Sequence, residues 1–182
     1  MIFQQGSIVV RKLRDSDKTL LAKWLSNPTI LQYYEGRDNP HNIELVTKHF
    51  FNVEDHYVTG CIVEYEGVEI GYIQYYPIEE EYKDKYGYNN RNEIVYGMDQ
   101  FIGESSYWNR GIGTELVRGM VYYLINELKV DVIAMDPQAW NERAVACYEK
   151  CGFKKVKLMP KHEWHEGEYR DCWLVEYRRE NK

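Results

Sequence analysis

Residues 106–114 read SYWNRGIGT, and residues 115–129, ELVRGMVYYLINELK, follow with the apolar spacing of an amphipathic helix. Gly111 and Gly113 at the start of that helix let backbone N–H groups approach a ligand closely, at the positive end of the helix dipole. Arg110 places a cation beside them. The stretch therefore predicts a loop that binds an anion such as a phosphate. A tight turn that holds no ligand is the alternative interpretation. The pattern is neither the GxxxxGK[ST] of a P-loop nor a GxGxxG followed by an acidic ribose ligand.

The rest of the chain alternates between strand and helix patterns. Strands are predicted at residues 7–13, 93–103, 130–137, 153–159 and 172–179, with a hairpin at 57–78 that turns at Glu66 and Gly67. Helices are predicted at 15–28, 42–51, 114–129 and 141–153, and polar loops at 33–40 and 79–92. Asp15 or Ser16 is expected to cap the first helix, and Asn141 the last. This order predicts an α/β layer fold on a mixed sheet, with a parallel, right-handed crossover within residues 94–135.

Length and composition limit the classes of protein to which the chain can belong. The chain has 182 residues, which favours one domain, and 44% of them are hydrophobic. No run is long enough to span a bilayer and the N-terminus lacks a signal-peptide core, so we expect a cytoplasmic protein without a membrane partner. The net charge of −6 and the 17 tyrosines disfavour nucleic acid and suit a cationic partner, although solubility alone also accounts for the charge. The four cysteines form no CxxC pair and are expected to be free thiols.

Two segments resemble the central motifs of the GNAT acetyltransferase superfamily. They are NRGIGTELV at residues 109–117 and DPQAWNERAVACYEKCGF at residues 136–153. The first departs from the family pattern, because Trp108 stands at its leading position and the basic residue is Arg110. The resemblance implies a mixed, mostly antiparallel central sheet with helices on both faces, and acetyl-CoA as co-substrate without a metal. The cofactor-binding residues that it implies are Phe101, Ile102, Arg110, Gly111, Ile112, Gly113, Thr114, Asn141 and Ala144.

A narrower resemblance is to the aminoglycoside 6′-N-acetyltransferases. It rests on KWLSNPTILQYYEGRD at residues 23–38, IGYIQYY at 70–76, residues 93–114 and 135–153, and HEWHEGEYRDCWLVEY at 162–177. The chain resembles notably the type found fused to an aminoglycoside phosphotransferase. Within 182 residues we expect a single acetyltransferase domain and no phosphotransferase. The resemblance implies acetyl transfer to the 6′-amine of a cationic aminoglycoside, hence antibiotic resistance, by a monomer or weak homodimer.

Amine acetylation needs a group that takes the proton of the acceptor and one that protonates the leaving thiolate. Asp99 interrupts an otherwise apolar strand, where a carboxylate is costly without a partner, and is the first candidate for the acceptor's proton. A strand-end aspartate that caps a loop is the alternative. The resemblance assigns Tyr148 to the thiolate, and packing in the core is its alternative role.

Substrate contacts are expected from Asp99 and from four further residues. Asp136 follows a buried strand, where α/β sheets place ligands, although an Asp-Pro turn explains it equally well. The resemblance alone adds Gln74, Asp171 is a further candidate on a late strand, and Tyr34 is a candidate aromatic wall for a polycation. Tyr33 and Glu35, together with the acidic residues 79–86, are candidate walls for a polycation.

Two other patterns are set aside. The histidines of HEWHEG, His162 and His165, are three apart rather than four as in a zinc protease, so a surface segment with a packed Trp164 is expected. Cys147 and Cys151 have no second ligand pair for a metal and are interpreted as core thiols. A GNAT enzyme for another amine, such as a siderophore precursor or a protein N-terminus, and a non-catalytic acyl-CoA sensor remain as alternative functions.

Overall fold

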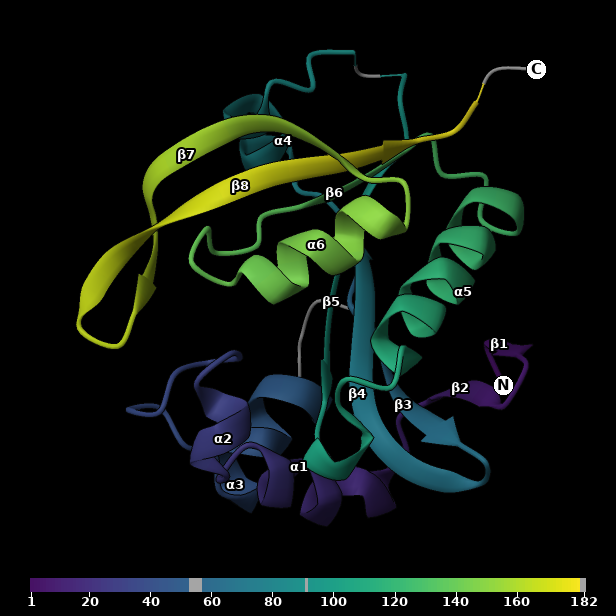
Figure 1. Ribbon diagram of the computed structural model, residues 1–182, viewed down its shortest axis with the longest axis vertical. Coiled ribbons are helices and arrows are strands. Elements are labelled where there is room, and N and C mark those ends of the chain that lie inside the picture. Colours follow the sequence, from purple (N-terminus) through teal and green to yellow (C-terminus); the bar gives the residue numbers. More distant parts are fainter. Residues whose placement is uncertain (53–56, 91, 181–182) are drawn as a thin grey trace.

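A computed structural model describes residues 1–52, 57–90 and 92–180, and it contains one eight-stranded sheet in the order β1-β2-β3-β4-β5-β6-β8-β7 (Figure 1). The strands are β1 (Phe3–Gln5), β2 (Ile8–Lys12), β3 (Thr59–Tyr65), β4 (Val68–Pro77), β5 (Val95–Ile102), β6 (Val132–Met135), β7 (Lys154–His165) and β8 (Glu168–Arg178). The helices are α1 (Lys18–Trp24), α2 (Pro28–Leu31), α3 (Ile43–Val46), α4 (Glu80–Tyr86), α5 (Ile112–Asn126) and α6 (Glu142–Lys150). β5 and β6 are parallel and the other neighbours are antiparallel, so the mixed, mostly antiparallel sheet is confirmed.

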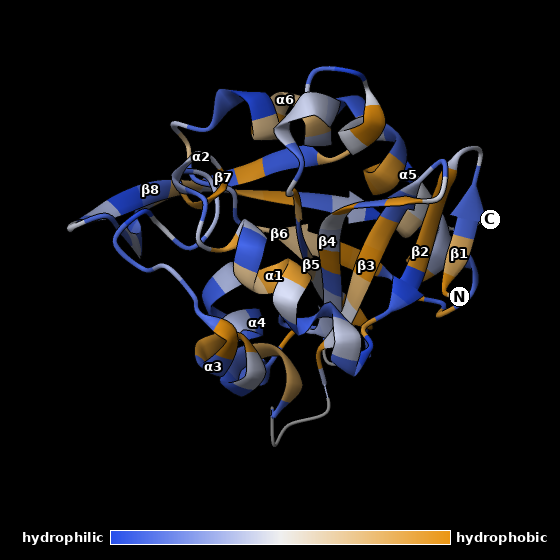
Figure 2. Cartoon of the chain, turned by 90° about the horizontal axis from the view of Figure 1, so that it is seen from below, coloured by the Kyte–Doolittle hydropathy of each residue, from blue (hydrophilic) through white to orange (hydrophobic). Residues whose placement is uncertain are grey.

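Helices cover both faces of the sheet. Along β3, Cys61 and Val63 belong to a core shared with α5 and α6, whereas Ile62 belongs to a core shared with α1, α2 and α3. A third core packs Tyr86 of α4 against β6 and β8. Figure 2 shows α5 and α6 on one side of the sheet and α1, α3 and α4 on the other. The period-two alternation of strand side chains thus produces the layered arrangement that was expected.

Three local predictions were wrong or incomplete. Residues 79–92 were expected to be a loop, but α4 forms there because Glu80 and Glu81 lie in its first turn and lysines in its last, which complements the helix dipole. Gly87, with φ of 89°, ends it. The N-terminal β1 was not predicted. The last hairpin is also longer than predicted. HEWHEG lies largely at the surface, as expected, but His165 is buried, and Trp164 is 59% exposed rather than packed.

No helix within the described ranges is both long and apolar enough to cross a bilayer.

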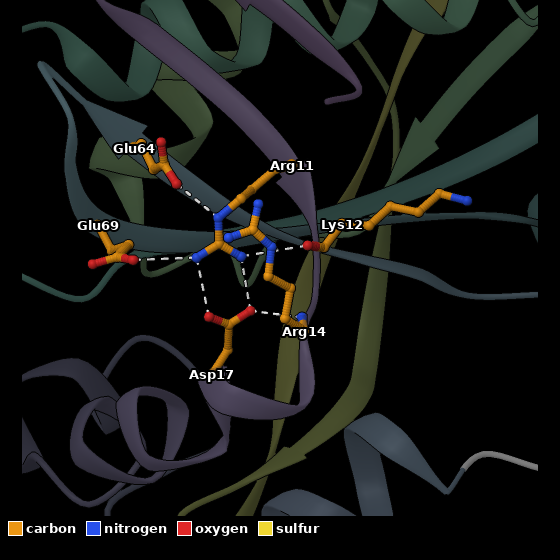
Figure 3. A network of polar contacts seen from close by, with 6 residues as sticks. All are labelled: Arg11, Lys12, Arg14, Asp17, Glu64 and Glu69. Carbon is orange, nitrogen blue, oxygen red and sulfur yellow. Dashed lines mark hydrogen bonds and ion pairs between the residues drawn. The ribbon is translucent and has the colours of Figure 1, made fainter.

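Asp17, rather than Asp15 or Ser16, organises the start of the first helix. Its carboxylate accepts a hydrogen bond of 2.7 Å from the backbone N–H of Arg14, and a helical turn over Asp15–Asp17 leads into α1. The same carboxylate receives two hydrogen bonds from Arg11, at 2.8 and 3.0 Å (Figure 3). The side chain is therefore fixed from two sides before α1 begins.

Arg11 is a buried cation on β2 with three carboxylate partners (Figure 3). Besides Asp17 it donates to Glu64 of β3 at 2.7 Å and to Glu69 of β4 at 3.2 Å. The guanidinium thus ties α1 to three adjacent strands. Burial raises the pKa of Asp17, but the hydrogen bonds from Arg11 and the Arg14 N–H outweigh burial, so the net pKa is lowered.

We predict that Asp17→Asn lowers the free energy of unfolding by about 3 kcal/mol, because it removes a charged partner from a buried guanidinium. Since the folded-state pKa of Asp17 lies below its ordinary value of 3.8, its contribution is present above that pH and is lost as the pH falls further. Urea unfolding at several pH values measures both effects. Asp15→Asn is the matched control, because the Asp15 side chain is 88% exposed, and it should change stability by no more than about 0.5 kcal/mol. Equal losses in the two variants would contradict the role given to the Arg11 cluster.

Candidate functional site

A cleft opens where β5 and β6 part. The two parallel strands pair only at Val95–Val132 and Tyr96–Ile133, and β5 then continues to Ile102 paired with β4 but not with β6. The cleft has a volume of about 1010 Å³ and is lined by β5 from Met98 onward and by the chain after β6. The first turn of α5, one face of α6, residues 33–39 and the end of the β7–β8 hairpin complete it. Carboxyl ends of parallel strands are where α/β folds bind ligands.

The glycine loop forms one end of this cleft. Gly111 is the residue before α5 and has φ of 79°, a conformation that favours glycine, and no side chain caps the helix. The first N–H groups of α5 therefore lack helical partners. Gly113 is not in a left-handed conformation, and a Cβ built on either glycine meets no atom within 4 Å. A turn requires glycine only at Gly111, so the open space at Gly113 favours a ligand over the tight-turn alternative.

The cation beside this loop is not the predicted one. The guanidinium of Arg110 lies 5.0 Å from the ring centre of Tyr107 and 5.7 Å from that of Tyr65, and Arg110 does not line the cleft. Among the described residues, the cleft's arginine and lysine side chains are instead Arg143 and Lys150, both on α6. Arg143 stacks on Trp108 at 4.6 Å and on Tyr33 at 4.9 Å. Its position within the second motif was the signal that sequence reasoning overlooked.

Asp99 lies on β5 within the cleft. Its Oδ2 accepts hydrogen bonds from Gln74 Nε2 at 2.9 Å and from the Tyr76 hydroxyl at 3.0 Å. Burial raises the pKa of Asp99, and the negative charges of Asp136 and Glu35 add to this, so that the hydrogen bonds only partly compensate. Asp99 is therefore a carboxylate that holds a proton more readily than an ordinary aspartate.

Asp136 lies directly after β6, and its pKa is shifted in the opposite direction to that of Asp99. Its Oδ2 is 2.7 Å from His162 Nε2 and accepts a hydrogen bond of 2.8 Å from the Tyr86 hydroxyl. Burial raises the pKa of Asp136, but these hydrogen bonds outweigh it and the net pKa is lowered. Tyr86 comes from α4 and His162 from β7, so no local pattern in the sequence could have found either partner.

Tyr148 on α6 is buried and points to the same cleft. Its hydroxyl oxygen accepts a hydrogen bond of 2.6 Å from Gln100 Nε2, and burial raises its pKa. The phenol is therefore neutral at pH 7 and its own O–H remains a donor. Gln100 Oε1 is buried without a hydrogen-bond partner among the described residues.

Most residues predicted from the sequence meet in the cleft. Those that line it are Tyr34, Gln74, Asp99, Phe101, Ile102, Gly111, Ile112, Gly113, Thr114, Asp136, Asn141, Ala144 and Tyr148. Arg110 and Asp171 do not line it. Asp171 is exposed on β8, and its carboxylate accepts a hydrogen bond of 2.9 Å from the Lys161 N–H.

The rim of the cleft is acidic and aromatic. Tyr33 and Glu35, predicted as walls for a polycation, line it, whereas residues 79–86 do not. The acidic side chains along the lining are Glu35, Asp38, Asp99, Asp136, Glu163 and Glu166. Arg37 pairs with Glu166 through two contacts of 2.7 Å and so joins the loop after α2 to the tip of the β7–β8 hairpin.

Within residues 1–52, 57–90 and 92–180, no three His, Cys, Asp or Glu side chains are grouped so that they could hold a metal ion. The four cysteines are free thiols.

Known proteins resemble this chain over most of its length. Residues 14–160 match the family model described as an acetyltransferase (GNAT) domain. An aminoglycoside N(6′)-acetyltransferase type 1 of Klebsiella pneumoniae is 30% identical over 151 residues, which are 82% of this chain and 75% of that protein. The crystal structure of aminoglycoside acetyltransferase AAC(6′)-Ib in complex with coenzyme A and kanamycin superimposes with a TM-score of 0.75 at 26% identity, covering 95% of each chain. An N5-hydroxyornithine acetylase of Beauveria bassiana is 26% identical over 147 residues, which are 79% of this chain and 26% of that protein.

The two cleft aspartates should respond to neutralisation with opposite signs. The pKa of Asp99 is raised, so above pH 3.8 folding disfavours its charge, and Asp99→Asn should raise the melting temperature at pH 7. The pKa of Asp136 is lowered, so its charge stabilises the fold above pH 3.8, and Asp136→Asn should lower the melting temperature. Calorimetric melting at pH 7 and near pH 3 measures both, and each difference should shrink at the acidic pH. Shifts of the same sign at pH 7 would contradict the assignment.

Proposed function

The chain belongs to the acetyltransferase (GNAT) family, and on that basis we propose that it transfers the acetyl group of acetyl-CoA to the 6′-amine of aminoglycoside antibiotics. The observation that carries the proposal is a cleft with an anion-binding loop at one end and six carboxylates along its lining. An acetylated amine has no charge and no longer forms charge-assisted hydrogen bonds to RNA phosphates, so the product is a weaker antibiotic.

The α5 end of the cleft suits the phosphates of acetyl-CoA. The unpaired N–H groups after Gly111 are donors for a pyrophosphate, and the space beside Gly113 lets the ligand reach them. Arg143 and Lys150 supply positive charge from α6, the role that the sequence had given to Arg110. Asn141 caps α6 by accepting a hydrogen bond from Ala144 N at 3.3 Å, and so fixes the helix that carries Arg143 and Tyr148.

The acidic lining suits a small polycation. Asp136 keeps its charge, because His162 and Tyr86 hold its carboxylate, and serves as an anchor for an ammonium group. Both hydrogen bonds to Asp99 go to Oδ2, so Oδ1 is left to face the acceptor. Its raised pKa brings Asp99 closer to the range in which a general base is effective.

The reaction then needs three proton transfers. Asp99 accepts the proton of the acceptor ammonium, directly or through water, and the free amine attacks the thioester carbonyl. The nitrogen of the adduct gives a second proton to water as the C–S bond breaks. The Tyr148 hydroxyl, whose oxygen is held by Gln100, donates its proton to the departing thiolate. A hydroxyornithine-type acceptor is a second candidate substrate, because the chain is similar to an N5-hydroxyornithine acetylase of Beauveria bassiana.

An acceptor panel tests the proposal. Thiol release from acetyl-CoA is measured with kanamycin, with an aminoglycoside that carries a 6′-hydroxyl, with N5-hydroxyornithine and with spermidine. We expect turnover with kanamycin, little with the 6′-hydroxyl analogue, and NMR of the product to place the acetyl group on the 6′-nitrogen. Acetylation at another amine, or faster turnover of hydroxyornithine, would replace the proposed substrate.

Asp99→Asn in the same assay tests the base. Loss of a general base should reduce kcat/KM for kanamycin by roughly 10²–10⁴, with a rate that recovers as the pH rises and free amine accumulates. If Asp99 only anchors the ammonium, KM rises while kcat holds, and the role of base is refuted.

Gly111→Ala should weaken coenzyme A binding. A methyl group there projects into open space where the pyrophosphate would lie, and the left-handed backbone adds a strain of about 1–2 kcal/mol. Gly87→Ala is the matched control, since Gly87 also has positive φ and an open Cβ position but lies outside the cleft. Calorimetric titration should show weaker binding in the first variant alone, while melting temperatures fall in both. Equal coenzyme A affinity in the two variants would overturn the proposed phosphate site.

A further inference from the structure

Cys147 differs from the other three cysteines in its surroundings. It is half-buried and lines the cleft, whereas Cys61 and Cys172 are fully buried and Cys151 is 8% exposed. Cys61 and Cys172 lie inside the sheet cores. A reagent that enters the cleft therefore reaches one thiol without unfolding of the chain.

The Cys147 sulfur lies in a cluster of donors and positive charges at the junction of α5 and α6. Its Sγ is 3.5 Å from Thr114 Oγ1, in the first turn of α5, where the helix dipole is positive. Cys151, one turn further along α6, has its Sγ 3.5 Å from the carbonyl oxygen of Thr114. Lys150 on α6 and Arg118 on α5 are the charged groups that act on Cys147, and Tyr148 is its neutral neighbour.

These surroundings favour the thiolate at Cys147 and disfavour it at the other cysteines. The neighbouring Cys151 thiol, the contact of 3.5 Å with the Thr114 hydroxyl and the charge of Lys150 together lower the pKa of Cys147 in spite of burial. Burial raises the pKa of Cys61 to about 12 and also raises that of Cys172. The thiolate is the nucleophile in disulfide exchange.

We propose that Cys147 is a modification site at which low-molecular-weight disulfides attach to the cofactor end of the cleft. The Cys147 thiolate attacks one sulfur of a disulfide R–S–S–R. A Cys147–S–S–R bond forms, the S–S bond of the reagent breaks, and RS⁻ leaves and takes a proton from water. The attached group lies beside Thr114 and Tyr148, so it excludes acetyl-CoA, and a free thiol restores the site by the reverse exchange. Only this exclusion of acetyl-CoA rests on the proposed function.

Reaction of the native full-length chain with dipyridyl disulfide tests the site, because released pyridinethione is counted by its absorbance. We expect one thiol per chain to react much faster than the rest at pH 7, and peptide mapping of that product to locate the adduct on Cys147. Cys147→Ser should remove the fast phase, and Cys172→Ser should leave it intact. A fast phase that persists in Cys147→Ser, an adduct mapped elsewhere, or reaction only after unfolding would overturn the proposal.

Cys151→Ala tests the cluster rather than the accessibility of the thiol. Without the Cys151 thiol beside it the pKa of Cys147 rises, so the pH at which the fast phase reaches half of its maximal rate should move upward. An unchanged rate profile would remove Cys151 and the thiolate from the explanation.

Coenzyme A added before the reagent tests whether a group attached to Cys147 and coenzyme A exclude each other from the cleft. Where calorimetry shows that coenzyme A binds, the fast phase should slow in proportion to occupancy, and an unslowed reaction would refute exclusion while leaving the proposed function intact. If coenzyme A does not bind at all, the proposed function fails, and the mapped adduct still decides the site.

Discussion

The short pairing between β5 and β6 is the constraint on which the rest of the site depends. β5 is held along its other edge by β4 from Tyr96 to Ile102, and β6 is held by β8 over its whole length. Each strand therefore follows its outer neighbour, and the two separate after two residue pairs. Because backbone donors and acceptors in the gap lose their strand partners, the gap is polar as well as open. A ligand can enter the sheet there without disturbing a core.

The two central carboxylates of the cleft, Asp99 and Asp136, have different surroundings and opposite pKa shifts, although both are partly buried. Asp136 has the hydroxyl of Tyr86 and the ring of His162 to stabilise its charge, and Asp99 has an amide and a phenol while facing the field of Asp136. One carboxylate stays charged and the other holds a proton more readily. Pairs of titratable groups with pKa values displaced in opposite directions are typical of catalytic sites. The arginine and lysine that line the cleft, Arg143 and Lys150, are both on α6, whereas Asp99 is on β5 and Asp136 directly follows β6.

Sequence patterns predicted the features that depend on neighbours along the chain. The glycine loop, α5, the cap at Asn141 and the placement of Asp99 on a strand follow from local spacing, and the structure agrees. The cofactor role of Arg110 stays a prediction, because its guanidinium lies over the rings of Tyr107 and Tyr65 and outside the lining of the cleft. Asp171 and Cys172 alternate on β8, so when Cys172 faces the core Asp171 faces outward. His162 and Tyr86 reach Asp136 from elements that are distant in sequence, which no local pattern encodes.

The strand order β6-β8-β7 has a consequence for synthesis of the chain on the ribosome. Among the described strands β7 pairs only with β8, and β8 emerges after β7. Until it inserts, β6 has an open edge, His162 has no fixed position beside Asp136, and the hairpin tip cannot meet Arg37. At roughly 5–20 residues per second the two strands and their turn take a few seconds to appear, during which the nascent chain exposes an unpaired strand edge. A nascent chain that lacks β8 therefore has the glycine loop without a finished acceptor site.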